Sequence, residues 1–198
     1  MSKREEYLNF SSLQKGEREG TNFTIAVVER LSPVAVIAPH GGAIEPATEG
    51  IASAIAHEDF SFYCFRAIAA ADPRKTLHIT SDRFDEPRCR ALVAKSDKII
   101  SVHGLKDTDK AFVDVGGLDT VLRDAVCRSL SQSGFVAVPV SRGAHAGISP
   151  RNICNRGKQN MGIQLEISRA LRDSLTGDAL QRFAAAIRSA VVESGSSN

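Results

Sequence analysis

Several kinds of segment are missing from this chain of 198 residues, and each absence excludes a class of protein. No run approaches the roughly 18 consecutive apolar residues that a membrane span requires. No run of lysine and arginine would build the basic face of a nucleic-acid-binding protein, and the net charge is only +2. We therefore expect neither a membrane nor a nucleic acid as partner. The charged start of the chain, residues 1–6, predicts no secretory signal.

Short catalytic and metal-binding motifs are missing as well. The four cysteines form no Cys-x-x-Cys pair, which argues against a zinc ribbon or a thioredoxin-type site and predicts reduced, partly buried thiols. The motif His-Glu-x-x-His is absent, because His57 and Glu58 are followed by Asp-Phe-Ser. The motif Gly-x-Ser-x-Gly is absent too, and no serine has an obvious histidine partner. A serine hydrolase is therefore not expected.

The composition itself is that of an ordinary globular domain, with 42% hydrophobic and 24% charged residues. Strand patterns alternate with helical patterns, which predicts an α/β sheet covered by helices on both faces. No internal repeat and no linker divides the chain, so a single domain is the simplest organisation. We expect residues 1–21 to form a loose lead-in, residues 22–193 the domain, and residues 194–198 a disordered tail.

Local patterns place the individual elements. Segments rich in β-branched and aromatic residues predict strands at 23–30, 34–38, 61–66, 76–81, 98–103, 111–115, 135–141 and 161–168. Helical spacing and capping residues predict helices at 49–58, 85–96, 119–131 and 177–193. Asp178 is a predicted N-cap of the last helix. The strand at 34–38 should stop at about Pro39, so that His40 stands on a loop.

Four polar residues occur at or near the ends of predicted strands. His40 and Glu45 follow the first buried strand on a segment that contains two glycines. His103 ends another strand and is also followed by a glycine, and Glu166 interrupts a third on the face opposite its apolar neighbours. Open α/β sheets bind their ligands at the carboxyl ends of strands. These side chains are therefore candidates for one site.

The residue types at this edge predict a zinc-dependent hydrolytic site. His40, Glu45 and His103 would hold the ion and leave a fourth position for water, whose pKa the metal would lower to about 7. Glu166 would then act as the general base that takes the proton of this water and returns it to the leaving amine. Each residue also has a structural alternative. His40 could be a polar residue at the sheet rim, and His103 could bond a neighbouring carbonyl. Glu45 could cap a helix, and Glu166 could pair with an arginine.

Six segments carry a resemblance to a known family: PHGGAIE at 39–45, TSDRFDEP at 80–87, SVHG at 101–104, GGLD at 116–119, NICNRG at 152–157 and MGIQLE at 161–166. Together they resemble the poly-γ-glutamate hydrolase family, zinc enzymes known chiefly from bacteriophages, over residues 22 to 190. The resemblance implies a single zinc carboxypeptidase-like α/β domain with a mixed parallel and antiparallel sheet flanked by helices. It also implies endo-hydrolysis of γ-glutamyl amide bonds.

Carried over by position, the resemblance implies Zn²⁺ as cofactor, His40, Glu45 and His103 as its ligands, and Glu166 as the catalytic base. Zinc carboxypeptidases space the first ligand pair His-x-x-Glu. Here four residues separate His40 from Glu45, which fits the hydrolase family and separates the chain from true carboxypeptidases.

The implied substrate, poly-γ-glutamate, carries one free carboxylate per residue. Arginine binds carboxylates through its planar fork, and one arginine could hold the oxyanion of the reaction. The predicted substrate contacts are Arg83, Asn152, Arg151, Asn155 and Arg156. Alternatively, Arg83 pairs with a neighbouring carboxylate and the other two arginines are solvated. His145 is a weaker candidate for the groove, while His57 and His78 are interpreted as structural.

Two other functions stay open at this stage. One is a zinc amidase for a small N-acyl amino acid, of the aspartoacylase or N-formylglutamate type, which needs a closed pocket. The other is a non-catalytic polyanion-binding relative that tolerates loss of Glu166. The short chain leaves little sequence for a lid and favours an open groove. We expect a monomer that stays in the cytoplasm until release and acts on extracellular capsule polymer after lysis.

Overall fold

The computed structural model describes residues 7–68, 72–105 and 109–194. The strands in this part of the chain are β1 (Phe23–Val28), β2 (Val34–Gly42), β3 (Ser61–Ala67), β4 (Lys98–Gly104), β5 (Val113–Gly117), β6 (Ala137–Pro139) and β7 (Ile163–Ile167). The helices are α1 (Phe10–Gly16), α2 (Thr48–Ala56), α3 (Pro73–Thr76), α4 (Pro87–Ala94), α5 (Thr120–Gln132), α6 (Arg169–Ser174) and α7 (Gly177–Glu193), with a 3-10 turn η1 at Ile153–Asn155.

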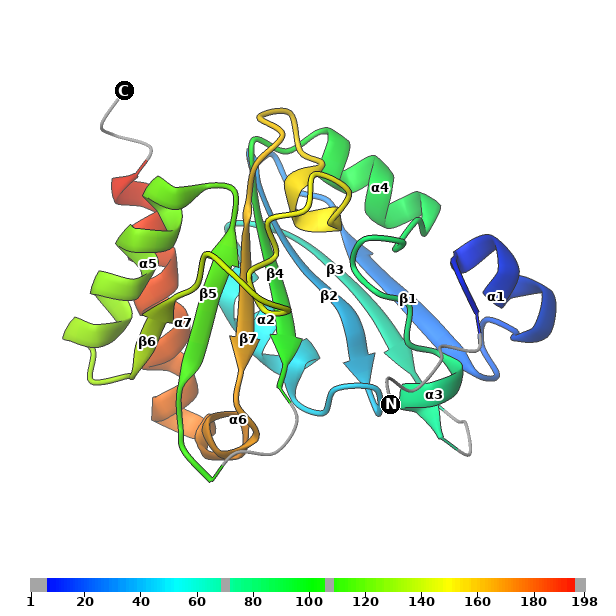
Figure 1. Ribbon diagram of the computed structural model, residues 1–198, viewed down its shortest axis with the longest axis horizontal. Coiled ribbons are helices and arrows are strands. Elements are labelled where there is room, and N and C mark those ends of the chain that lie inside the picture. The colour runs from blue at the N-terminus through cyan, green and yellow to red at the C-terminus, as the bar shows by residue number, and fades with distance from the viewer. Residues whose placement is uncertain (1–6, 69–71, 106–108, 195–198) are drawn as a thin grey trace.

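These strands form one mixed sheet in the order β1-β3-β2-β4-β7-β5-β6 (Figure 1). The central strands β3, β2, β4 and β7 run parallel, so their carboxyl ends meet at one edge. β1 runs antiparallel to β3, and β5 runs antiparallel to β7. The predicted α/β class, with a mixed sheet in a single domain, is confirmed. No helix among the described residues is long and apolar enough to cross a membrane.

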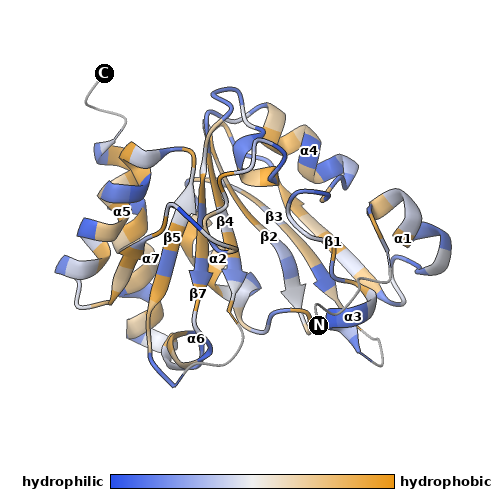
Figure 2. Cartoon of the chain, in the orientation of Figure 1, coloured by the Kyte–Doolittle hydropathy of each residue, from blue (hydrophilic) through white to orange (hydrophobic). Residues whose placement is uncertain are grey.

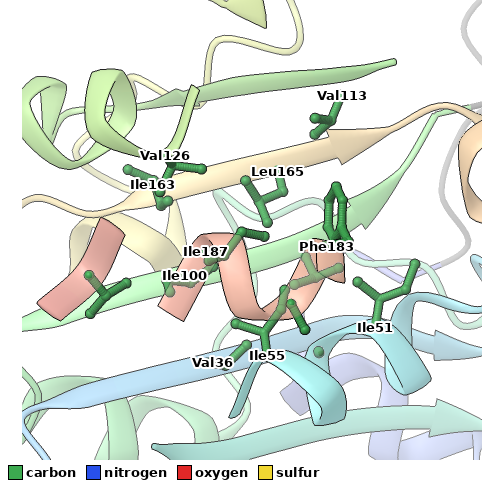
Figure 3. Close-up of a cluster of buried hydrophobic side chains, with 14 of the residues drawn as sticks. Val36, Ile51, Ile55, Ile100, Val113, Val126, Ile163, Leu165, Phe183 and Ile187 are labelled. Atoms are coloured by element: carbon green, nitrogen blue, oxygen red, sulfur yellow. The ribbon is translucent and has the colours of Figure 1, made fainter. Parts of the chain in front are cut away.

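Helices cover both faces of the sheet, as the alternation of patterns predicts. On one face, α2, α5 and α7 pack against alternate residues of the central strands, including Ile100, Ile163 and Leu165 (Figure 3). On the other face, α1 and α4 pack over a second cluster that includes Phe65. Figure 2 shows hydrophobic residues along the central strands and hydrophilic residues on α4 and α5. The four cysteines are free and buried, as expected.

Several local predictions are wrong or incomplete. The segment 76–81 is not a strand, because Asp72 and Pro73 begin the short helix α3 and an extended loop follows it. Leu77 and Ile79 alternate with polar residues as in a strand. Both side chains are buried in the second cluster, but they reach it from that loop. The N-cap position of α7 is Thr176, not Asp178. Helix α6 was not predicted. Residues 1–6 and 195–198 of the expected lead-in and tail lie outside the described residues.

Strand β2 continues past Pro39 to Gly42, so the prediction that it stops near Pro39 with His40 on a loop is wrong. Its register against β3 shifts by one residue at this point. Ala38 pairs with Cys64 and Gly41 pairs with Arg66, so one residue of β2 has no counterpart. Such a β-bulge is a usual place for proline, which has no N–H group for the ladder.

The bulge decides which face of the sheet His40 occupies. Ala35 and Ile37 belong to the second cluster, and strict alternation would point His40 to the opposite face. Instead, the ring of His40 lies beside Phe84 of the second cluster and beside His103 of β4. The extra residue therefore returns His40 to the face that carries His103.

Gly42 ends the bulged strand with φ at +63°, and a Cβ atom there would collide with the backbone oxygen of Ala67. We expect Gly42→Ala to lower the free energy of unfolding by about 2 kcal/mol, because a side chain is disfavoured in the left-handed region and the strand cannot shift. Gly50 is the matched control. It lies in α2 with nothing near its Cβ position, so Gly50→Ala should raise stability by about 0.5–1 kcal/mol. Urea unfolding measures the stability of both variants. A wild-type free energy of unfolding in Gly42→Ala would contradict the need for glycine at this position.

Candidate metal centre

A pocket of about 610 Å³ opens at the carboxyl ends of β2, β4 and β7. Of the residues predicted for the site, it is lined by His40, Glu45, Arg83, His103, Arg151, Asn152 and Glu166. Asn155 and Arg156 are not among its lining residues. The fold therefore collects most of the predicted site from segments that are distant in the sequence.

Three of these side chains converge on one point. Nδ1 of His40 lies 3.0 Å from Oε1 of Glu45 and 3.1 Å from Nδ1 of His103. Nδ1 of His103 lies 3.6 Å from Oε2 of Glu45. All three residues are buried. Two imidazole nitrogens and one carboxylate thus face one another away from bulk water.

The opposite nitrogen of each imidazole ring already has a partner. Nε2 of His40 lies 2.8 Å from the backbone oxygen of Ile79. A carbonyl can only accept, so in the neutral ring Nε2 carries the proton and Nδ1 holds the free electron pair. Nε2 of His103 lies 2.8 Å from the hydroxyl of Ser101 and 3.3 Å from that of Ser81. Outer partners of this kind orient metal-binding histidines in known sites.

The chemistry of this donor set fits a divalent cation. Electron-pair donors that face one another in a buried space repel unless a proton or a metal ion lies between them. Zinc binds such donors at about 2.0–2.1 Å in tetrahedral geometry, which places the donors about 3.3 Å apart. The observed separations of 3.0, 3.1 and 3.6 Å lie around this value.

The pKa values reflect the same concentration of charge. Burial raises the pKa of Glu45, but the nearby His40 and His103 outweigh this effect and hold the pKa well below the usual range. Burial lowers the pKa of His40, but the charge and hydrogen bond of Glu45 outweigh it and raise the pKa overall. Glu45 is therefore ionised, as a metal ligand must be.

His78, which we interpret as structural from the sequence, lies beside this group. Its Nε2 lies 3.9 Å from Oε1 of Glu45, and ligand atoms of His40, Glu45 and His78 all lie within 4.8 Å of one another. Its ring stacks over that of His40, with centroids 4.1 Å apart and planes tilted by 32°. The Nδ1 electron pair of His40 lies in the plane of its ring, and an ion bound there would lie in that plane too. The ring of His78 is stacked above this plane, so His78 is less well placed than His103 to bind the same ion.

The environment keeps His78 neutral. The charge of His40 and burial lower the pKa of His78 to about 3. The one sequence signal for this residue was its position two residues before the TSDRFDEP segment.

Glu166 occupies the neighbouring position on the sheet, since its β7 register partner on β4 is His103. Burial raises the pKa of its carboxyl group, and the charge of His103 opposes this effect without cancelling it. The predicted alternation of β7 is confirmed, because Ile163, Leu165 and Ile167 point into the core on the opposite face. Glu166 therefore faces the pocket as a partly desolvated carboxyl group beside the three converging side chains.

A directed chain of hydrogen bonds holds one oxygen of Glu166. Nε2 of Gln164 donates to Oε1 of Glu166 at 2.7 Å, and Oε1 of Gln164 accepts from Nδ2 of Asn152 at 2.8 Å. Oδ1 of Asn152 accepts in turn from the backbone N–H of Cys154 at 3.1 Å. A backbone N–H can only donate, so the N–H of Cys154 fixes the orientation of the Asn152 amide, which in turn fixes that of Gln164. The NH₂ group of Gln164 therefore points at Glu166. Sequence reasoning did not single out Gln164.

The remaining predicted residues fall into different settings. Arg83 and Arg151 are exposed at the pocket, where Nη2 of Arg151 lies 3.8 Å from Oδ2 of Asp82. Asn155 is buried, and its side-chain amide donates to two backbone carbonyls of the loop before it, at 2.7 and 2.9 Å. Arg156 is half-buried at the end of η1. Asn155 therefore anchors a loop in this structure.

Comparison with known proteins places this architecture. The family model of poly-gamma-glutamate hydrolase matches residues 7–190. The protein YndL of Bacillus subtilis (strain 168) is 38% identical over 172 residues, which are 86% of this chain and 67% of YndL. The structure of a bacteriophage poly-gamma-glutamate hydrolase superposes with a TM-score of 0.93 at 28% identity and covers 98% of this chain and 100% of that one.

Two further structures bear on the fold. YndL in a zinc-free apo form superposes with a TM-score of 0.87 at 31% identity, over 96% of this chain and 99% of that one. A putative carboxypeptidase from Burkholderia mallei, at 14% identity and a TM-score of 0.51, shares the fold alone, over 89% of this chain and 60% of that one. The predicted carboxypeptidase-like fold is confirmed. With a family match along nearly its whole length, the chain belongs to the poly-γ-glutamate hydrolase family.

Proposed function

We propose that this protein is a zinc-dependent hydrolase that cuts γ-glutamyl amide bonds within poly-γ-glutamate. The observation that carries the proposal is the convergence of His40, Glu45 and His103 beside Glu166 in one pocket of this family's fold. These three residues would hold the ion through two imidazole nitrogens and a carboxylate. When bound, zinc supplies a Lewis acid that polarises the scissile carbonyl and acidifies water. The relative YndL, whose apo form is described as zinc-free, supports the choice of metal.

Glu166 is the proposed general base. Its Oε1 is held by Gln164, so its Oε2 is the oxygen that would take the proton of the attacking water. The same oxygen would then deliver the proton to the leaving amine nitrogen. A raised pKa suits this double duty, because it makes the carboxylate a stronger base for the proton of water, and the resulting acid can still give that proton to the amine.

The polymer would lie across the pocket with its free carboxylates toward Arg83 and Arg151. Both side chains are exposed at the pocket, and guanidinium groups bind carboxylates through paired hydrogen bonds. Asn152 is better explained as a support of Gln164 than as a substrate contact, since it is buried and its amide donates to that residue. The similarity to a bacteriophage poly-gamma-glutamate hydrolase supports the choice of polymer, and we propose that the protein acts on capsule polymer after lysis.

The function is tested by the viscosity of a poly-γ-glutamate solution and by the sizes of the products. We expect viscosity to fall early while few new amino groups appear, as endo-cleavage requires. Glu166→Gln should lower the rate about 100- to 10,000-fold with zinc content and fold retained. Full activity in that variant would remove Glu166 as the base. Products limited to single glutamates, or turnover restricted to small N-acyl amino acids, would contradict the polymer assignment.

The ligand set is tested by elemental analysis of purified variants. The wild-type chain should carry about one zinc ion. His40→Ala and His103→Ala should lose it, whereas His78→Ala should keep it, because the ring of His78 is stacked over that of His40. If His78→Ala loses zinc while His103→Ala retains it, the third ligand is His78.

The pKa of the Glu166 carboxyl group should depend on whether zinc is bound. In metal-free protein, burial places the pKa of this carboxyl group above the ordinary range for glutamate, so the group gains its charge only as the pH rises through the raised value. Bound zinc favours the charged form and should move the pKa down. Titration of the ¹³C-labelled carboxyl by NMR, with and without zinc, measures both values. Equal pKa values in the two states would place the ion away from Glu166.

A further inference from the structure

A buried arginine on helix α6 lies behind the proposed metal centre. Arg172 is only 2% exposed, and its guanidinium group donates hydrogen bonds to three backbone carbonyls. Nη1 donates to Pro46, Nη2 to Leu105 at 2.8 Å, and Nε to Ile167 at 3.1 Å. The side chain therefore joins three segments that are far apart in the sequence.

Each of these carbonyls lies one or two residues after a residue of the proposed site. Pro46 follows Glu45, Leu105 follows the His103-Gly104 pair, and Ile167 follows Glu166. Figure 1 shows α6 at the end of β7, next to the end of β4, where these segments meet. One side chain thus contacts all the chain segments that carry the carboxylate ligand, the second histidine and the base.

Burying the charge of Arg172 costs free energy, so we expect the residue to have a role that offsets this cost. Among the described residues no carboxylate lies within ion-pair distance of Arg172, so a buried charge is balanced at close range only by neutral carbonyls. Burial lowers the pKa of Arg172, and the charge of Glu45 is the largest influence that opposes this. A guanidinium group donates in fixed directions to several acceptors at once, which the single nitrogen of lysine cannot do.

The same contact accounts for the glycine that follows His103. A Cβ atom at Gly104 would lie 2.7 Å from Cζ of Arg172, so any other residue there would push the guanidinium away. The backbone N–H of Gly104 also donates to Oε2 of Glu45 at 2.8 Å. The segments of Glu45 and His103 are therefore joined directly to each other and are both held by Arg172.

We propose that Arg172 is a positioning residue that fixes Glu45, His103 and Glu166 relative to one another and thereby sets the metal affinity of the site. It acts through Pro46, Leu105 and Ile167 and touches neither the ion nor the substrate. The effect on affinity rests on the proposed function, whereas the hydrogen bonds that form the clamp exist without a metal.

Zinc affinity is the first test, measured by competition with a chelator on folded protein. Arg172→Met removes the clamp, and Arg172→Lys keeps the charge but not the planar fork. Both should raise the zinc dissociation constant, by about 10- to 100-fold for Arg172→Met. Arg188→Met is the matched control, because Arg188 also donates to a backbone carbonyl, that of Ala54 in α2, at 2.6 Å, outside the pocket. It should keep the wild-type constant.

Hydrogen exchange of the Gly104 amide in metal-free protein is the second test. The Gly104–Glu45 hydrogen bond should open more often without the clamp, so exchange should be faster in both Arg172 variants and unchanged in Arg188→Met. If Arg172→Met fails to fold, Arg172→Lys decides. Wild-type zinc affinity together with wild-type exchange in a folded Arg172 variant would overturn the inference. If the wild-type chain binds no zinc, the proposed function fails, and the exchange rates alone decide whether the clamp exists.

Discussion

The site is governed by the meeting of two imidazole nitrogens and a carboxylate in a buried space. Nδ1 of His40 lies within 3.1 Å of both other donors, and its far nitrogen is committed to a backbone carbonyl. Donor groups placed this close repel one another unless a proton or a metal ion lies between them. The bulge in β2 brings His40 to the required face, the Gly104 amide fixes Glu45, and the loop after α3 supplies the carbonyl that orients His40. Much of the local backbone is thus arranged to bring these three donor groups together.

Much of the frame could be predicted from the sequence, because it depends on short-range patterns. β-branched apolar runs identify the central strands, and a period of two in residues 161–168 shows that Glu166 points away from the core. The carboxyl ends of parallel strands meet at one edge, so His103 and Glu166 could be expected near each other from the sequence alone. The resemblance of six short segments to a hydrolase family then joined these residues to a chemistry, and the family itself is confirmed.

The features that sequence reasoning missed all depend on long-range geometry. A register shift at Pro39 leaves no trace in hydropathy, yet it decides the direction of His40. Arg172 looks like any surface arginine in a helix too short to show a period, because its partners are main-chain carbonyls without a side-chain signature. The role of Gln164 likewise depends on the hydrogen bond that it accepts from Asn152 in another segment. The false strand at 76–81 arose because alternating burial in a loop resembles that in a strand.

The most direct test of the central claim is the position of the metal in crystals of the zinc-loaded protein, located by anomalous scattering at the zinc absorption edge. The account predicts one peak at about 2.0–2.1 Å from Nδ1 of His40, Nδ1 of His103 and a carboxylate oxygen of Glu45. Glu166 should lie outside this coordination shell with an oxygen directed toward the open position. A peak bound to His78 in place of His103, or no peak among these residues, would contradict the account.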